Sequence, residues 1–143
     1  MTVARSLTLF LAATSLASVG YAADGGRKLQ TSLTGAAEAP GPGDTDGRGT
    51  ATVTVNSGKA KICYTLSARN IDTATMAHIH AGAKGVAGPV VVTLKAPATG
   101  SSSGCATVAR ALALKILKAP ANYYVNVHNA AFPGGAIRGQ LAK

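Results

Sequence analysis

Apolar and polar residues alternate strictly in two neighbouring segments, 50–55 and 59–66. Successive side chains of a β-strand point to opposite faces, so this pattern predicts two strands that each have one apolar face. The residues expected to face the core are Ala51, Val53, Val55, Ala60, Ile62, Tyr64 and Leu66. The sequence Asn-Ser-Gly at 56–58 is typical of a turn, which makes the pair a predicted hairpin.

Short β-prone runs recur along the rest of the chain, separated by segments rich in Gly, Pro and Ser. The predicted strands lie at 28–33, 75–81, 90–94, 104–108, 123–128 and 136–141, and the predicted loops at 35–49, 82–88, 96–104 and 129–135. The segment 109–118 (ARALALKILK) instead favours a helix, with lysines late in it and Pro120 after it. About seven short strands with one short helical insertion predict an all-β fold, an antiparallel β-sandwich or flattened barrel.

The first residues have the pattern of a secretory signal peptide. Arg5 gives a basic start, residues 7–19 are apolar, and Gly20 and Ala22 supply the small residues of a cleavage site. We therefore expect cleavage after Ala22, which removes 22 of the 143 residues and leaves 121 in one exported domain, periplasmic or secreted. No apolar segment after the signal has the length of a membrane span.

The chain is strongly basic, with 14 Lys and Arg against 5 Asp and Glu. Loss of Arg5 with the signal leaves 13 against 5, a net charge of +8. The positive residues are scattered and are not interleaved with aromatic residues, which argues against nucleic acid as a partner. A dispersed basic surface fits anionic lipids, polysaccharides or small anions better.

The chain has two cysteines, Cys63 and Cys105. An even count in an exported protein favours a disulfide, and two cysteines allow one intramolecular pairing. It would close a loop of about 43 residues, worth roughly 4 kcal/mol in the chain-entropy account. Buried free thiols and a metal ligand are the alternatives.

All three histidines lie near the ends of short apolar runs. A strand would place His78 and His80 on one face, and His128 on a face with Tyr124 and Asn126. If the three imidazoles meet, they form a site for one copper or zinc ion with a position left open. The alternative is that they form hydrogen bonds to backbone at the ends of barrel strands.

Three longer segments carry a family resemblance: AHIHAGAKGVAGPVVVTL at 77–94, GCATVARAL at 104–112 and YYVNVHNAAFPGGAIRGQL at 123–141. In this order and spacing they resemble the CHRD domain, named after repeats in the secreted protein chordin and found in many exported bacterial proteins. The resemblance covers 29–141 and implies a secreted, immunoglobulin-like β-barrel. It implies a binding or structural module for an extracellular or envelope protein or matrix component, without a settled activity.

The order of the histidines is also similar to that in copper/zinc superoxide dismutases, which carry a His-x-His on one strand of a Greek-key barrel. By this resemblance His78, His80 and His128 match copper ligands, and Arg138 matches the arginine that steers the anion. No histidine is left to bridge to zinc, no His/Asp cluster is present to hold it, and the cysteine positions differ. A binuclear site is therefore excluded.

Two functions follow as hypotheses. The first is an exported binding or structural module with a mononuclear histidine site inside it. The alternative is a copper-binding or superoxide dismutase-like redox protein that uses the three histidines, with Arg138 guiding an anion. An incomplete catalytic set favours the module over an enzyme. A barrel-end arginine such as Arg138 also commonly pairs with a carboxylate or with backbone carbonyls.

Overall fold

Eight antiparallel strands form one continuous sheet in the computed structural model, which describes residues 25–143. The predicted signal peptide at 1–22 lies outside the described residues. The strands are β1 (Arg27–Thr34), β2 (Arg48–Asn56), β3 (Lys61–Arg69), β4 (Ala74–Ala81), β5 (Val90–Leu94), β6 (Ser101–Thr107), β7 (Tyr123–Asn129) and β8 (Ile137–Gln140). The helices are η1 (Gly35–Ala37), α1 (Arg110–Lys118) and η2 (Pro120–Asn122).

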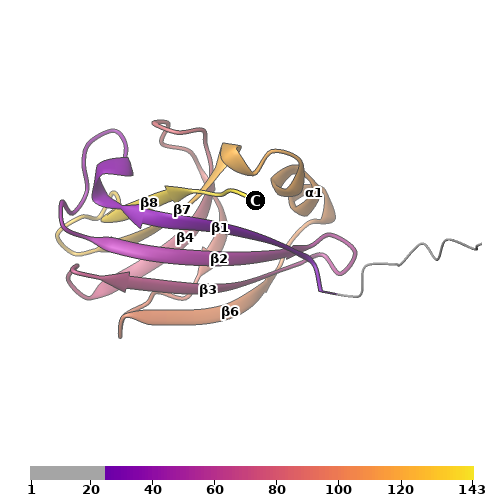
Figure 1. The fold of residues 1–143 in the computed structure, drawn as a ribbon, viewed down its shortest axis with the longest axis horizontal. Helices are drawn as coiled ribbons and strands as arrows, with labels where there is room; N and C mark the ends of the chain where they lie inside the picture. Colours follow the sequence, from indigo (N-terminus) through magenta and orange to yellow (C-terminus); the bar gives the residue numbers. More distant parts are fainter. Residues whose placement is uncertain (1–24) are drawn as a thin grey trace, which may run out of the picture.

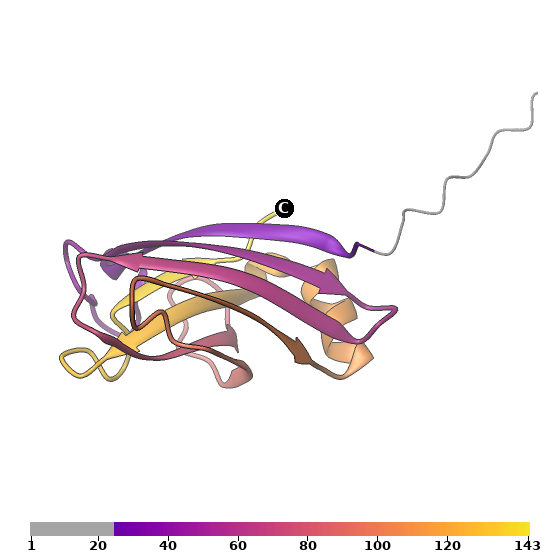
Figure 2. The ribbon, with the colours of Figure 1, turned by 90° about the horizontal axis from the view of Figure 1, so that it is seen from below.

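The sheet curls into a flattened, nearly closed barrel. Its strand order is β5-β4-β7-β8-β1-β2-β3-β6, and the two edge strands β5 and β6 contact each other. Figure 1 shows α1 at one end of the barrel, and Figure 2 shows β1, β2 and β3 as one layer above the other strands. The predicted all-β fold with one helix is confirmed, with eight strands in place of about seven.

The predicted hairpin of β2 and β3 is confirmed, with Val53 opposite Tyr64 and Val55 opposite Ile62. The prediction that Ala60 faces the core is wrong. Ala60 has a φ of +50° and belongs to the turn, so β3 begins at Lys61, two residues after the start of the predicted segment 59–66. Ala60 continues the alternation of apolar and polar residues, but its backbone does not have the extended conformation of a strand.

The prediction of a loop through 96–104 is also wrong in part, because Ser101, Ser102 and Ser103 belong to β6. These residues pair with β3, where Ser101 lies opposite Ser67 and Ser103 opposite Thr65. A run of small polar residues is typical of a loop, but strand preference depends on context, and here the pairing with a long neighbouring strand decides the structure.

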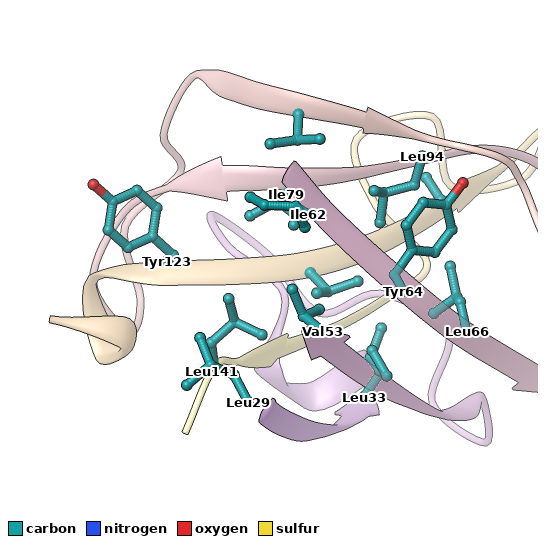
Figure 3. Packing of buried hydrophobic residues seen from close by; sticks show 14 of the residues in the cluster. Leu29, Leu33, Val53, Ile62, Tyr64, Leu66, Ile79, Leu94, Tyr123 and Leu141 are labelled. Carbon is teal, nitrogen blue, oxygen red and sulfur yellow. The ribbon is translucent and has the colours of Figure 1, made fainter. Parts of the chain in front are cut away.

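The core lies between the two layers of the barrel. Figure 3 shows Leu29, Val53 and Ile79 from three different strands converging on this interior. Helix α1 covers one end of it with Ala113 and Ile116, both fully buried. Among the described residues, the apolar side chains of the strands thus fill the interior, and their alternate side chains point to the outer face of the sheet.

A disulfide joins Cys63 and Cys105, as the sequence predicts, and no free cysteine is present among the described residues. The two residues lie directly opposite each other on β3 and β6, with their Cα atoms 3.9 Å apart. The bond thus ties the edge strand β6 to the body of the sheet.

Candidate metal centre

The three histidines lie on the outer face of the barrel. On β4 the alternate residues Ala77 and Ile79 are buried in the core, so His78 and His80 point outward. On the neighbouring strand β7, Val127 faces the core and His128 points outward. Strand alternation therefore puts His78 and His80 on one face, as the sequence predicts, and the pairing of β4 with β7 adds His128 to that face.

These imidazoles also meet in space. One ring nitrogen from each of His78, His80 and His128 lies within 4.8 Å of the others. The Nδ1 atom of His78 is 3.1 Å from the Nε2 atom of His128. Two nitrogens bound to one ion at about 2.0–2.1 Å lie about 3 to 3.5 Å apart, so this pair already has the spacing of two ligands.

Two backbone carbonyls fix two of the rings. The Nδ1 atom of His80 is 2.8 Å from the Gly88 carbonyl oxygen, and that of His128 is 2.9 Å from the Pro133 carbonyl oxygen. A carbonyl only accepts, so each Nδ1 carries a proton, and in its neutral form the His80 ring keeps its lone pair on Nε2. The second nitrogen of a metal-bound histidine typically makes this kind of contact.

The second ring nitrogen of His80, Nε2, has no hydrogen-bond partner in the described part of the chain. It is also buried. A buried polar atom without a partner costs about 1–3 kcal/mol. A metal ion bound at this lone pair would remove that cost, so the donor set fits a metal.

The same surroundings keep two of the rings neutral. Burial lowers the pKa of His78 below its ordinary value, and the neighbouring charges of His128 and His80 lower it further. Burial also lowers the pKa of His128; the hydrogen bond with Pro133 opposes this shift and His80 adds to it. Neutral imidazole is the form that binds metal, so these two rings are suited to coordination at neutral pH.

Asn126 and Glu38 extend the centre away from the histidines. The Oδ1 atom of Asn126 lies 3.0 Å from His128 Nε2, and the Asn126 side chain also forms a hydrogen bond with the Glu38 carboxylate. Burial raises the pKa of Glu38 to about 7, although the positive charge of Arg138 opposes the shift. The Glu38 carboxylate is thus connected to His128 through the side-chain amide of Asn126.

Replacing Glu38 with glutamine is expected to remove a pH dependence of stability. Because the pKa of Glu38 rises from 4.5 to about 7 on folding, the folded chain keeps a proton that the unfolded chain has released. This contribution to stability is complete below pH 4.5 and is lost as the pH rises through about 7. The melting temperature of Glu38→Gln should therefore gain on that of the wild type between about pH 5 and pH 8.

Thermal melts of both proteins across this range measure the effect. The titration of the histidines is common to both proteins and cancels in the comparison. Two melting curves that shift in parallel with pH would contradict the expectation.

Arg138 lies beside the histidines without contacting them. It is 1% exposed, and its guanidinium carbon lies 3.4 Å from the centre of the Tyr124 ring. The guanidinium donates to the Ala83 carbonyl oxygen at 2.9 Å and to Gln140 Oε1, while Nη1 is buried without a partner. The Tyr124 ring is in turn stacked on His80, with the ring centres 4.8 Å apart. Tyr124 therefore connects the arginine to one candidate ligand.

A model of the CHRD domain matches residues 29–141, which is nearly all of the chain that the structure describes. The chain belongs to the CHRD family. No curated protein and no solved structure matches it. The CHRD resemblance predicted from the three sequence motifs is thus confirmed, together with its β-barrel.

Sequence reasoning missed some parts of this CHRD site. The carbonyls of Gly88 and Pro133 carry no signal in the sequence, because any residue has a carbonyl. Glu38 is distant in the chain and reaches the site through the loop before β2, which no local pattern reveals. Asn126 and Tyr124 could be placed with His128, since they alternate with core residues on one strand.

Proposed function

We propose that this CHRD domain is an exported binding module that holds one copper or zinc ion at His78, His80 and His128. The single observation that carries the proposal is the buried Nε2 of His80, which has a lone pair and no partner beside two other imidazoles. Two carbonyl contacts, from Gly88 and Pro133, orient the rings of His80 and His128. When bound, the ion would join strands β4 and β7 through their side chains.

Export is part of the same proposal. The disulfide between Cys63 and Cys105 is typical of proteins that leave the reducing cytosol. No helix among residues 25–143 has the length and hydropathy needed to cross a bilayer. We infer that the segment 1–22 is a signal peptide cleaved after Ala22. We also infer that the partner of the module is an extracellular or envelope protein or a matrix component, and not a nucleic acid.

The alternative function is superoxide dismutase-like redox chemistry at copper. It is favoured by one observation, the partial exposure of His78, which leaves one side of the cluster open to small molecules. In this alternative the positive charge of Arg138 would attract the anion. A superoxide assay on the copper-loaded protein, with His80→Ala as the blank, separates it from simple metal binding.

The proposed function predicts metal-dependent stability. Copper or zinc at about 100 times its dissociation constant should add about 2.7 kcal/mol to the free energy of unfolding, or about 10 °C to the melting temperature. Thermal melts with and without metal measure this effect in the wild type and in His78→Ala, His80→Ala and His128→Ala. Each of the three variants should lose most of it.

Ser103→Ala is the matched control, because Ser103 lies on β6, outside the cluster, and is exposed. It should keep the full stabilisation by metal. A wild-type melting temperature that does not change with either metal would contradict the proposed function.

A further inference from the structure

A methionine lies beside the three histidines. Met76 is on β4, and it is the only methionine among the described residues. Its side chain is 46% exposed, although a methionine usually packs in a protein interior. It stands two residues before His78, so both side chains belong to the outer face of the strand.

The strand register brings Met76 close to the cluster a second time. Met76 on β4 is directly opposite His128 on β7. The Cβ atoms of such a cross-strand pair lie about 4.5–5.5 Å apart, and diagonal neighbours are still within reach of long side chains. Met76 is therefore next to one candidate ligand across the sheet and next to another along the strand. Its unbranched side chain has three rotatable bonds with which to turn its sulfur toward them.

Among the described residues, no carboxylate belongs to the histidine cluster as a possible fourth metal ligand. The described group of residues that could hold a metal consists of the three histidines alone. The nearest acid that touches this network is Glu38, and Asn126 separates it from His128. The thioether of Met76 is therefore the side-chain group that we consider as a fourth protein ligand on the exposed side of the cluster.

We propose that Met76 is the fourth ligand and makes this centre selective for copper(I). The inference rests on the proposed function, since it assigns a metal and an oxidation state to the same site. Three imidazoles suit zinc and both states of copper, but a thioether is a soft ligand that favours copper(I). Four protein ligands also close the coordination sphere, as in metal sites that hold an ion without acting on a substrate. The centre would then store or carry copper.

The test compares the wild type with Met76→Leu. Leucine keeps the size and the apolar character of the side chain and removes the sulfur, and the site is exposed, so the fold should be retained. Copper(I) affinity is measured without oxygen by competition with a chromogenic chelator, and zinc affinity is measured in the same way. We expect Met76→Leu to weaken copper(I) binding by at least about tenfold and zinc binding by less than about twofold.

X-ray absorption of the copper(I)-loaded protein gives a second readout. The wild type should show a sulfur neighbour at the metal, and Met76→Leu should show nitrogen neighbours only. Leu114→Ile, a change at an exposed apolar residue on α1, is the control and should leave both affinities unchanged.

The outcomes separate this inference from the proposed function. Equal copper(I) affinity in the wild type and Met76→Leu, without a sulfur neighbour, would overturn the role of Met76 and leave the histidine site intact. A wild type that binds neither copper(I) nor zinc would overturn the proposed function and, with it, this inference.

Discussion

Replacing both Cys63 and Cys105 with serine is expected to lower the free energy of unfolding by about 2–4 kcal/mol. The disulfide joins residues 42 positions apart, and it restricts the unfolded chain by closing that loop. In the folded chain it holds β6, an edge strand of the sheet, to β3. Urea denaturation of the oxidised wild type and of the double variant measures the difference.

A matched control is available on the same two strands. Thr65 and Ser103 form the neighbouring pair on β3 and β6, and the double variant Thr65→Ala/Ser103→Ala leaves the disulfide in place. It should cost much less than loss of the disulfide. Equal urea midpoints for the wild type and the cysteine double variant would show that the covalent link contributes nothing.

Ile79→Ala is expected to cost about 2–5 kcal/mol, the range for a large residue truncated in a packed core. Ile79 has no exposed surface and lies between His78 and His80 on β4. It contributes to the core on one face of the strand that carries two candidate ligands on the other. Truncation leaves a cavity that the rigid barrel can fill only in part.

Ile79→Val is the control, with an expected cost of about 0.5–1.5 kcal/mol because it removes a single methylene. Equilibrium denaturation of both variants gives the comparison. If the alanine variant costs no more than the valine variant, packing at this position does not support the strand.

The sequence was most informative where one face of a strand is buried. Strict alternation predicted that Val53, Ile62 and Tyr64 face the core, and all three are buried. It could not locate the start of β3, because Ala60 satisfies the alternation and yet takes a left-handed backbone conformation. A turn is decided by backbone geometry, which the pattern of apolar side chains does not describe.

Non-local pairing explains the rest of the difference. Residues 101–103 have the composition of a loop, and they form a strand because β3 offers them hydrogen bonds. His78 and His128 are 50 residues apart in the sequence, and they meet because β4 lies next to β7 in the sheet. Periodicity gave the face of each histidine, and the CHRD resemblance gave the barrel. The carbonyl partners and Glu38 come from loops, which neither source describes.

The proposed function requires that His78, His80 and His128 bind one metal ion together. Pulsed electron paramagnetic resonance on the protein loaded with one equivalent of copper(II) tests it most directly, because it counts the imidazoles bound to the metal. We expect a single copper species with three coupled imidazoles in the wild type, and loss of one imidazole in His80→Ala. A spectrum without imidazole nitrogens, or one that His80→Ala leaves unchanged, would contradict it.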